Sequence, residues 1–484
     1  MKNRILVLLL CLCMVLTVFA GCGTKETQDP SDTDNGQTSS KDTVETDAEP
    51  DFGDIKFDCE INILQRDGAV REEWDAEVED NTIMQHALIE KVGYLEEKYG
   101  VSFQYYAVHV NDVTQVEASI LSNSAYYHIM TLPHLHMASM ASQGLLRNVA
   151  AIENVDLSQP WWSQQLNNEL DYKGSLYFAT GNSNLCSMWY TNAVFFNKDM
   201  AQALGYSVSD IYASVNDHTW TAEKMLSMAN ELYVDRDGQE GATLGDRYGI
   251  SQTSAWFPVF YGAGLKLATK NDDGKFVVNT ISQDIIDNIT SIINYQNDGD
   301  TAVPLSAGLN QWEVFANGNA LFLMDGIAYS HYVKGSTIDY GILPCPLGES
   351  GQANYYNFVH QGHDSAFAVP ADTAEGDLAM IGIMLEESNY ISRKKVWPEF
   401  YNTLMKGQLA RDPESAAILD IIFDNLIIDP VLIYGVTNAA SFDTTIRKLI
   451  TDNDYSNVGS TLNGIVNTVQ GNLDKYNDAY DLIG

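Results

Sequence analysis

Segments with strand patterns alternate with segments with helix patterns through the first part of the chain. Residues 58–64 alternate into an apolar run, as a strand does, and the turn residues Gln65-Arg66-Asp67-Gly68 follow them. Residues 81–99 repeat apolar side chains at helical spacing, and residues 101–108, 113–121 and 128–132 then read as strand, helix and strand. Strands that alternate with helices in this way predict an α/β fold with a largely parallel sheet.

The same alternation continues along the rest of the chain. Residues 374–484 are predicted to be nearly all helical, with a helix at 415–423 and a last helix that carries Leu462, Val466, Val469 and Leu473. Strands are expected at 175–180, 187–196, 321–324, 337–344 and 365–369, and helices at 197–204, 222–232 and 283–295.

The N-terminus has the pattern of an export signal. Lys2 and Arg4 precede a charge-free apolar run, and small residues stand directly before Cys22. A run this short with a small-residue cleavage site predicts a signal peptide over residues 1–21 rather than a spanning helix. The end of the segment resembles the bacterial lipoprotein signature, with Phe19 where leucine is usual. The resemblance implies that Cys22 is lipidated and holds the protein at the extracellular face of the cell membrane; secretion without a lipid is the alternative.

Residues 22–51 are rich in acidic, amide and hydroxyl side chains and contain no aromatic residue. A segment of this composition is predicted to be a disordered acidic tether, since it has too little apolar surface to offset its ordering entropy. The body that follows, from residue 52, is long enough for two domain-sized units.

Charge and cysteine content narrow the classes of partner. The net charge of -38 argues against nucleic acid and against an anionic membrane surface, so that the lipid is the one expected link to the membrane. Of the six cysteines, Cys59, Cys186 and Cys345 remain in the body, without zinc-site spacing. We read them as small buried side chains, with one disulfide as the alternative.

Several stretches, in order, resemble family 1 of the extracellular solute-binding proteins. The resemblance covers residues 58–450 and is weakest at 427–438. Its segments are Tyr177 to Leu185, Trp189 to Asp199, Trp220 to Met225, Phe315 to Gly326, Asp339 to Pro344, Phe367 to Pro370 and Ala410 to Asp424.

The resemblance implies an α/β, two-lobed periplasmic-binding-protein-like fold with a ligand cleft between the lobes and several hinge crossings. We place the crossings near Tyr177, Met324 to Gly326 and Val369, and expect Gly181 and Gly326 to meet a tight approach or a positive φ there. The first lobe is then expected over 52–177 and 325–369, and the second over 178–324 and 370–484.

A sugar site needs flat aromatic platforms and polar groups that both donate and accept hydrogen bonds. The 8 tryptophans and 26 tyrosines supply aromatic candidates, and strand ends supply polar ones. Trp256 is the foremost candidate, because its loop lines the cleft in relatives, and of the adjacent Trp161 and Trp162 one at most faces it. The candidate ligand-binding residues are Asp67, His134, Asn182, Trp189, Trp256, Tyr261, Asp325, Tyr329 and His363.

No catalytic residue is predicted, because the sequence has no His-Glu-x-x-His, Gly-x-Ser-x-Gly or Walker motif. We expect no cofactor and no metal, although His134 and His136, or His360 and His363, have ligand-like spacing. The resemblance implies a monomeric receptor that captures a carbohydrate, an oligosaccharide by expectation, and delivers it to the permease of an ABC transporter. A receptor for a peptide or another small solute, or a ligand-sensing module, remains the alternative.

Overall fold

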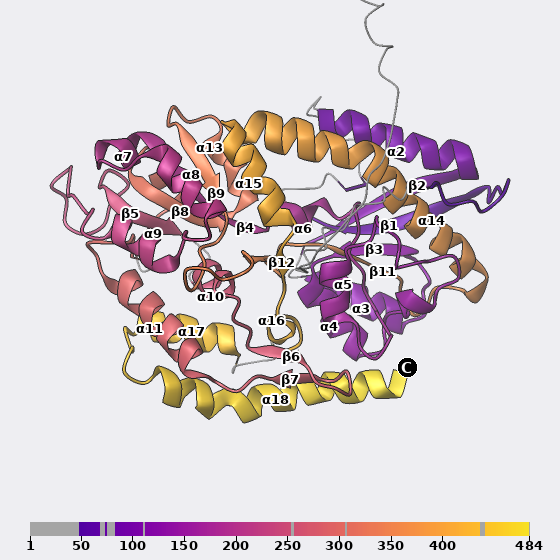
Figure 1. The fold of residues 1–484 in the computed structure, drawn as a ribbon. Coiled ribbons are helices and arrows are strands. Elements are labelled where there is room, and N and C mark those ends of the chain that lie inside the picture. The colour runs from indigo at the N-terminus through magenta and orange to yellow at the C-terminus, as the bar shows by residue number, and fades with distance from the viewer. Residues whose placement is uncertain are drawn as a thin grey trace, which may run out of the picture. The chain divides into compact units, whose positions relative to one another are not determined.

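The computed structural model describes residues 48–67, 73–74, 83–109, 112–252, 256–304, 307–435 and 441–483. Residues 49–484 make up one compact unit, and the description concerns that unit. Its fold is a two-lobed α/β fold with one four-stranded sheet in each lobe (Figure 1). The predicted signal peptide and Cys22 lie outside the described residues.

The first sheet has the order β11-β3-β1-β2. Strands β1, β2 and β3 are parallel, and β11 is antiparallel to β3. The carboxyl ends of the three parallel strands therefore share one edge with the start of β11, where Ala366 lies opposite Leu132. The strands are β1 (Cys59–Arg66), β2 (Val101–Val108), β3 (Ile129–Leu132) and β11 (Ala366–Ala368).

The second sheet has the order β5-β8-β4-β9. Strand β8 is parallel to β5 and antiparallel to β4, so that Gln252 and Asn192 lie opposite Met324 and Gly326 at one end of the sheet. The strands are β4 (Asn192–Asn197), β5 (Tyr248–Gln252), β8 (Ala320–Gly326) and β9 (Tyr340–Leu343). Two-stranded pairs are formed by β6 (Ala268–Lys270) with β7 (Phe276–Val278), and by β10 (Asn357–Phe358) with β12 (Leu426–Ile427).

Helices cover both sheets. Those before β8 are α2 (Ile83–Tyr99), α3 (Val113–Leu121), α4 (His134–Ser142), α5 (Gln164–Leu170), α6 (Leu185–Trp189), α7 (Lys198–Ala203), α8 (Val208–Asn216), α9 (Ala222–Ala229), α10 (Phe257–Gly262), α11 (Gln283–Asn297) and α12 (Gln311–Ala316). Those after β8 are α13 (Ser330–Val333), α14 (Leu378–Ile391), α15 (Pro413–Phe423), α16 (Pro430–Tyr434), α17 (Phe442–Thr451) and α18 (Val458–Ile483). Short 3₁₀ turns are η2 (Val149–Ala151), η4 (Ile327–Tyr329) and η5 (Glu375–Asp377), and two π-helical stretches, η6 (Ser392–Val396) and η7 (Glu399–Leu409), follow α14.

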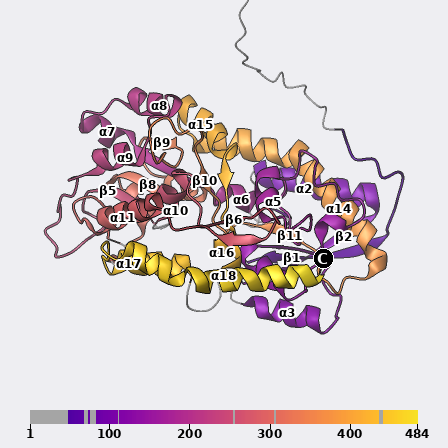
Figure 2. The ribbon, with the colours of Figure 1, turned by 60° about the horizontal axis from the view of Figure 1, so that its bottom comes forward.

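The C-terminal helices contact elements of both lobes. Helix α14 and η6 pack on α2 beside the first sheet, whereas α15 packs on β9 of the second. Helix α18 contacts β7 and α4 as well as α11, and Figure 2 shows it running from beside α17 to the C-terminus. The assignment of residues 370–484 to the second lobe stays a prediction, and the helices of this segment contact both lobes. Strand β9 differs from expectation, because it lies in segment 325–369 yet pairs with β4.

Of two expected strands, that at 175–180 does not form, and that at 187–196 forms only from Asn192 onward. Residues 175–180 make only isolated bridges, such as Ala179 with Phe367, and residues 185–189 form helix α6 before β4 begins at Asn192. The ordered unit also begins earlier than expected, at Glu49, whose carboxylate accepts a hydrogen bond from Tyr94 (2.5 Å) and pairs with Lys98 (2.7 Å).

The two expected hinge glycines need no positive φ. A Cβ on Gly181 would lie 2.2 Å from Oδ1 of Asn389 and 2.9 Å from the carbonyl of Trp161, so close approach alone requires glycine. Gly326 has a φ of −62°, and a Cβ there would make ordinary contacts at 3.4 Å.

Candidate functional site

The ends of the two sheets meet at one group of residues, which we name the strand-end cluster: Arg66, Tyr190, Asp325, Tyr329, Tyr332, His360 and His363. Arg66 ends β1, and its Nη1 donates to the carbonyl of His363 (3.1 Å). The backbone N–H of His360 donates to the carbonyl of Tyr190 (3.1 Å), and that of Ile327 donates to the carbonyl of Thr191 (2.9 Å). These bonds tie the edge of the first sheet to the Asn192 end of the second.

Aromatic rings line this junction. The rings of Tyr190 and His363 lie 5.0 Å apart between centroids, and His363 lies 4.6 Å from His360. Tyr332 is 49% exposed and stacks on Trp312 at 5.0 Å, with Tyr329 at 5.8 Å. Half-buried rings of this kind offer faces on which an apolar ligand surface can stack.

Burial holds two titratable groups of the cluster, Tyr190 and His360, in their neutral forms. Burial raises the pKa of Tyr190 to about 12, and the nearby carboxylate of Asp325 acts in the same direction. Burial lowers the pKa of His360 to about 3, and the charges of His363 and Arg447 lower it further. At neutral pH the cluster therefore presents a phenol and an imidazole that hydrogen-bond without charge beside the Arg66 guanidinium.

Several buried polar atoms without a hydrogen-bond partner belong to residues in or next to these strands and to the segments that carry the cluster. Among the described residues they include Nε of Arg66, Oγ1 of Thr131, both side-chain atoms of Asn192, Oγ of Ser330 and Oε1 of Gln361. Leaving such atoms unsatisfied costs roughly 1–3 kcal/mol each, so groups like these favour a site completed by water or ligand.

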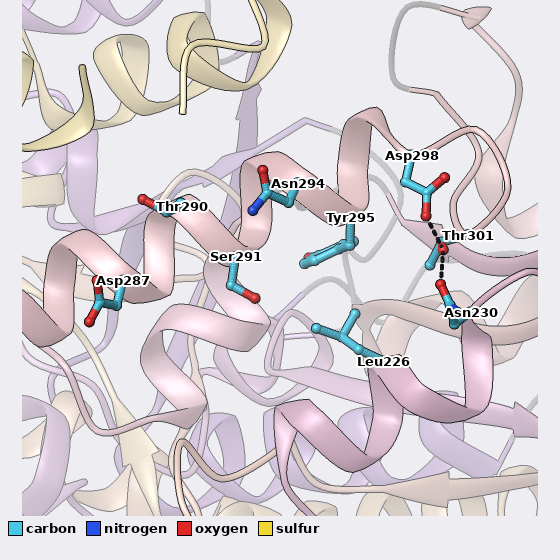
Figure 3. A pocket seen from close by; sticks show the side chains of 9 residues that line it. All are labelled: Leu226, Asn230, Asp287, Thr290, Ser291, Asn294, Tyr295, Asp298 and Thr301. Carbon is cyan, nitrogen blue, oxygen red and sulfur yellow. Dashed lines mark hydrogen bonds between the residues drawn. The ribbon is translucent and has the colours of Figure 1, made fainter. Parts of the chain in front are cut away.

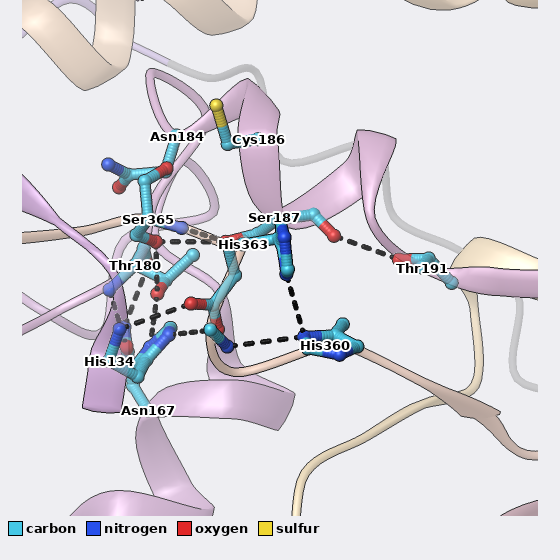
Figure 4. A network of polar contacts seen from close by, with 12 residues as sticks. His134, Asn167, Thr180, Asn184, Cys186, Ser187, Thr191, His360, His363 and Ser365 are labelled. Carbon is cyan, nitrogen blue, oxygen red and sulfur yellow. Dashed lines mark hydrogen bonds and ion pairs between the residues drawn. The ribbon is translucent and has the colours of Figure 1, made fainter. Parts of the chain in front are cut away.

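His134 lies beside the cluster, where its ring is held by hydrogen bonds within the protein (Figure 4). Its Nδ1 bonds the buried carboxylate of Asp364, and its Nε2 lies 3.0 Å from Oγ1 of Thr180. Its backbone N–H also donates to Asp364 (3.1 Å). His134 is fully buried and both of its ring nitrogens are engaged, so it has a structural role in this arrangement, and its contact with ligand stays a prediction.

Three predicted aromatic contacts are likewise core residues. Trp256 is 0% exposed, and its Nε1 donates to Asp443 (2.8 Å). Tyr261 is fully buried, donates to Asp429 (3.2 Å) and stacks on Phe358 at 4.4 Å. Trp189 is buried against Phe400 at 5.2 Å. None of the three presents a free face in this structure, because α10 and the end of α6 are buried.

Four of the five remaining candidates lie at or near the sheet edges, and Asn182 does not. Asp325, Tyr329 and His363 belong to the strand-end cluster, and Asp67 directly follows Arg66 with its N–H bonded to Val108 (2.7 Å). Asn182 lies elsewhere, in a pocket beside Trp161. Asn192, Ser330 and Gln361 were not among the predicted residues, because the sequence does not show whether a buried polar side chain has a partner.

Two adjoining hollows lie between α9 and α11, and Figure 3 shows one of them. Their volumes are about 400 and 890 Å³, and they share Leu226, Asn230, Asp287 and Ser291. Tyr295 is the single aromatic residue that lines either of them within the described chain, so they lack the stacking surfaces of a sugar site.

Three carboxylates come close enough to share a cation. Asp235, Asp237 and Asp246 place one oxygen each within 4.8 Å of the others. Their oxygens already accept hydrogen bonds from their own loop, as Asp246 does from the N–H groups of Arg236 and Thr243 (3.1 Å each). The group is therefore explained by loop structure. None of the described helices is long and apolar enough to cross a membrane.

Comparison with known proteins gives one family and many similar folds. The family described as "Bacterial extracellular solute-binding protein" matches residues 73–380. No curated protein matches the chain.

Among solved structures, M. tuberculosis UspC is 14% identical with a TM-score of 0.54, covering 85% of this chain and 100% of its own. A cyclo/maltodextrin-binding protein complexed with maltotetraose is 13% identical with a TM-score of 0.53, covering 88% and 96%. A Thermotoga lettingae ABC transporter solute-binding protein bound with α-D-tagatose is 14% identical with a TM-score of 0.53, covering 86% and 99%.

Proposed function

The chain belongs to the bacterial extracellular solute-binding proteins, and from that premise we propose that it captures a carbohydrate, an oligosaccharide, at the strand-end cluster. Proteins of this family bind small molecules and work with the permeases of ABC transporters. In our proposal this one acts as a monomer, is held at the extracellular face of the membrane by a lipid on Cys22, and delivers its sugar to such a permease.

The observation that carries the proposal is the combination of rings and unpartnered polar atoms at the strand ends. Ligands of α/β sheets bind outside the carboxyl ends of strands, where Arg66 and Asp325 lie. Tyr190 and Tyr332 offer ring faces, and the unpartnered atoms of Asn192, Ser330 and Gln361 match the hydroxyls of a sugar. The neutral state of His360 and Tyr190 suits an uncharged ligand.

The ligands of the similar structures support the same class. Maltotetraose is an oligosaccharide and α-D-tagatose a monosaccharide, and each occupies a protein of this fold. Sequence identities of 13 and 14% carry the fold and leave the ligand to be tested on this chain.

A thermal-shift screen of the full chain tests the proposal. The panel holds maltotetraose, other malto- and galacto-oligosaccharides, α-D-tagatose, tri- and tetrapeptides and divalent metals. A ligand at about 100 times its Kd adds about 2.7 kcal/mol to the stability of the folded state, which the screen detects. We expect a rise with one oligosaccharide series. A rise confined to peptides or metals contradicts the carbohydrate proposal.

A further inference from the structure

A pocket that adjoins the strand-end cluster is lined by several aromatic side chains. We name it the Trp397 pocket; its volume is about 370 Å³. None of its lining residues belongs to the strand-end cluster. Its aromatic lining consists of Trp161, Trp162, Trp397, Tyr401 and Phe423. We propose that the Trp397 pocket is a second carbohydrate-binding site, which takes a mono- or disaccharide independently of the strand-end cluster.

Trp397 is held as a rigid platform. Its ring stacks on Tyr401 at 5.3 Å with 18° between the planes, and Phe423 meets both rings edge-on. Tyr401 is itself fixed, since its hydroxyl donates to Asp420 (2.5 Å) and the ammonium of Lys406 lies 4.6 Å from its ring centroid. A partly buried indole that neighbours hold in place loses little conformational entropy when a sugar face stacks on it.

The backbone that carries these residues is unusual. Arg393 lies in the π-helical stretch η6 and Tyr401 in η7, with Trp397 between them. π-Helical turns are rare and occur frequently at functional sites. This segment brings the guanidinium of Arg393 and the rings of Trp397 and Tyr401, spaced four residues apart, to the wall of one pocket.

The opposite wall is supplied by the first lobe and is equally fixed. The indole N–H groups of Trp161 and Trp162 donate to the two oxygens of Glu386 (2.8 and 2.9 Å). Asn182 follows Gly181, where a Cβ would clash with the carbonyl of Trp161. This wall therefore has a set position relative to α14.

The polar groups around the pocket match sugar hydroxyls. Asn182 and Gln164 bring amides, Arg393 a guanidinium, and Asp424 an exposed carboxylate, so that donors and acceptors surround the aromatic surface. The volume is at the lower end of the range for small-molecule sites, which suits one or two sugar rings rather than a longer chain.

The two sites adjoin without sharing residues. Met188 lines the Trp397 pocket, Tyr190 belongs to the strand-end cluster, and the buried Trp189 between them packs on Phe400. The proposal goes beyond the receptor function, because it requires a sugar to bind at Trp397 whether or not Tyr190 is intact.

Fluorine NMR of the full chain labelled with 5-fluorotryptophan tests this second site. The chain has 8 tryptophans, and Trp397→Phe identifies the resonance of Trp397. The probes are glucose, galactose, maltose and lactose, with the dipeptide Ala-Ala as the non-sugar probe. We expect one of the sugars to shift the Trp397 resonance saturably, with the same Kd in the wild type and in Tyr190→Ala.

Variants of the pocket wall complete the experiment. Tyr401→Ala removes the support of Trp397 and is expected to raise that Kd at least tenfold, whereas Tyr455→Ala, at an exposed tyrosine outside the pocket, leaves it unchanged. The proposal is overturned if no sugar moves the Trp397 resonance up to its solubility limit, if only Ala-Ala does, or if the shift vanishes in Tyr190→Ala. If Tyr401→Ala does not fold, the titration of the wild type still tests the proposal. A shift of the Trp397 resonance in a protein that binds no sugar at the strand-end cluster counts against the receptor proposal and leaves the Trp397 site standing.

Discussion

The buried aromatic residues fall into two groups, those whose polar atom has a hydrogen-bond partner and those whose polar atom has none. Nε1 of Trp256 and the hydroxyl of Tyr261 each donate to a buried or half-buried carboxylate, whereas Nε1 of Trp189 has no partner among the described residues. A ring whose polar atom is satisfied inside the core contributes to stability. Tyr190 differs from all three, because it is half-buried and lies beside His363.

Truncation of Trp256 should therefore act on stability. Trp256→Ala removes a fully buried ring that packs on Phe257, Phe260 and Tyr261, and leaves the Asp443 carboxylate with Arg447 as its side-chain donor. We expect the free energy of unfolding to fall by about 3–5 kcal/mol, measured by urea denaturation. Trp312→Ala, at a partly buried ring, is the control. Wild-type stability together with weakened sugar binding in Trp256→Ala would restore Trp256 to the ligand site.

Among the elements, α14 fixes segments of the first lobe with two neighbouring carboxylates. Glu386 accepts hydrogen bonds from Trp161, Trp162 and the N–H of Asp156 (3.2 Å). Glu387 pairs with Lys98 (2.7 Å) and accepts from Tyr99 (2.9 Å). Both carboxylates are buried, so α14 is bound to this lobe through charge-assisted bonds as well as apolar packing.

The Glu386 carboxyl predicts a pH dependence of stability. Burial raises its pKa from 4.5 to about 7, so the folded state binds a proton that the unfolded state releases between these values. Its contribution is present below about pH 4.5 and is lost as the pH rises through about 7. From pH 4.5 to 8 we expect the wild type to lose roughly 2–4 kcal/mol relative to Glu386→Gln in urea melts. Equal pH profiles for the two proteins would refute this assignment, and Glu375→Gln, at an exposed carboxylate, should retain the wild-type profile.

Elements with a clear period were predictable from the sequence, and elements set by tertiary contacts were not. Residues 101–108 and 283–297 form the expected strand and helix, since each has the apolar spacing of its type. The strand expected at 187–196 begins only at Asn192, because residues 185–189 form α6, and a short apolar run does not separate the two states. The pairing of β9 with β4 likewise depends on contacts between distant segments.

The same limit applies to the site. Strand ends at Arg66 and Asp325 were predictable as places for ligand-binding groups, because the topology of an α/β sheet puts them there. The sequence did not predict which of the adjacent residues Trp189 and Tyr190 faces outward. Helix α6 ends between them, and the packing of Phe400 on Trp189 decides which one is buried. The burial of Trp256 also depends on tertiary packing and could not be predicted from the sequence.

For the whole molecule, the proposed lipid makes the N-terminus the attachment point of the receptor. Cys22→Ala removes the thiol that would be acylated, so we expect the protein to move from the membrane fraction to the medium, followed by immunoblotting of both fractions. Ser39→Ala, within the proposed tether, is the control and should leave the protein at the membrane. Continued membrane retention of Cys22→Ala would show that the lipid assignment is wrong.

Titration calorimetry of the full chain tests most directly whether this protein is a sugar receptor that binds at the strand-end cluster. The oligosaccharide identified by the thermal-shift screen is titrated into the wild type and into Tyr190→Ala, with Tyr126→Ala, at an exposed tyrosine, as the control. We predict saturable binding by the wild type and by Tyr126→Ala, and a loss of about 1–3 kcal/mol, tenfold or more in Kd, in a folded Tyr190→Ala. Unchanged affinity in Tyr190→Ala, or heat of binding from peptides alone, would contradict the account.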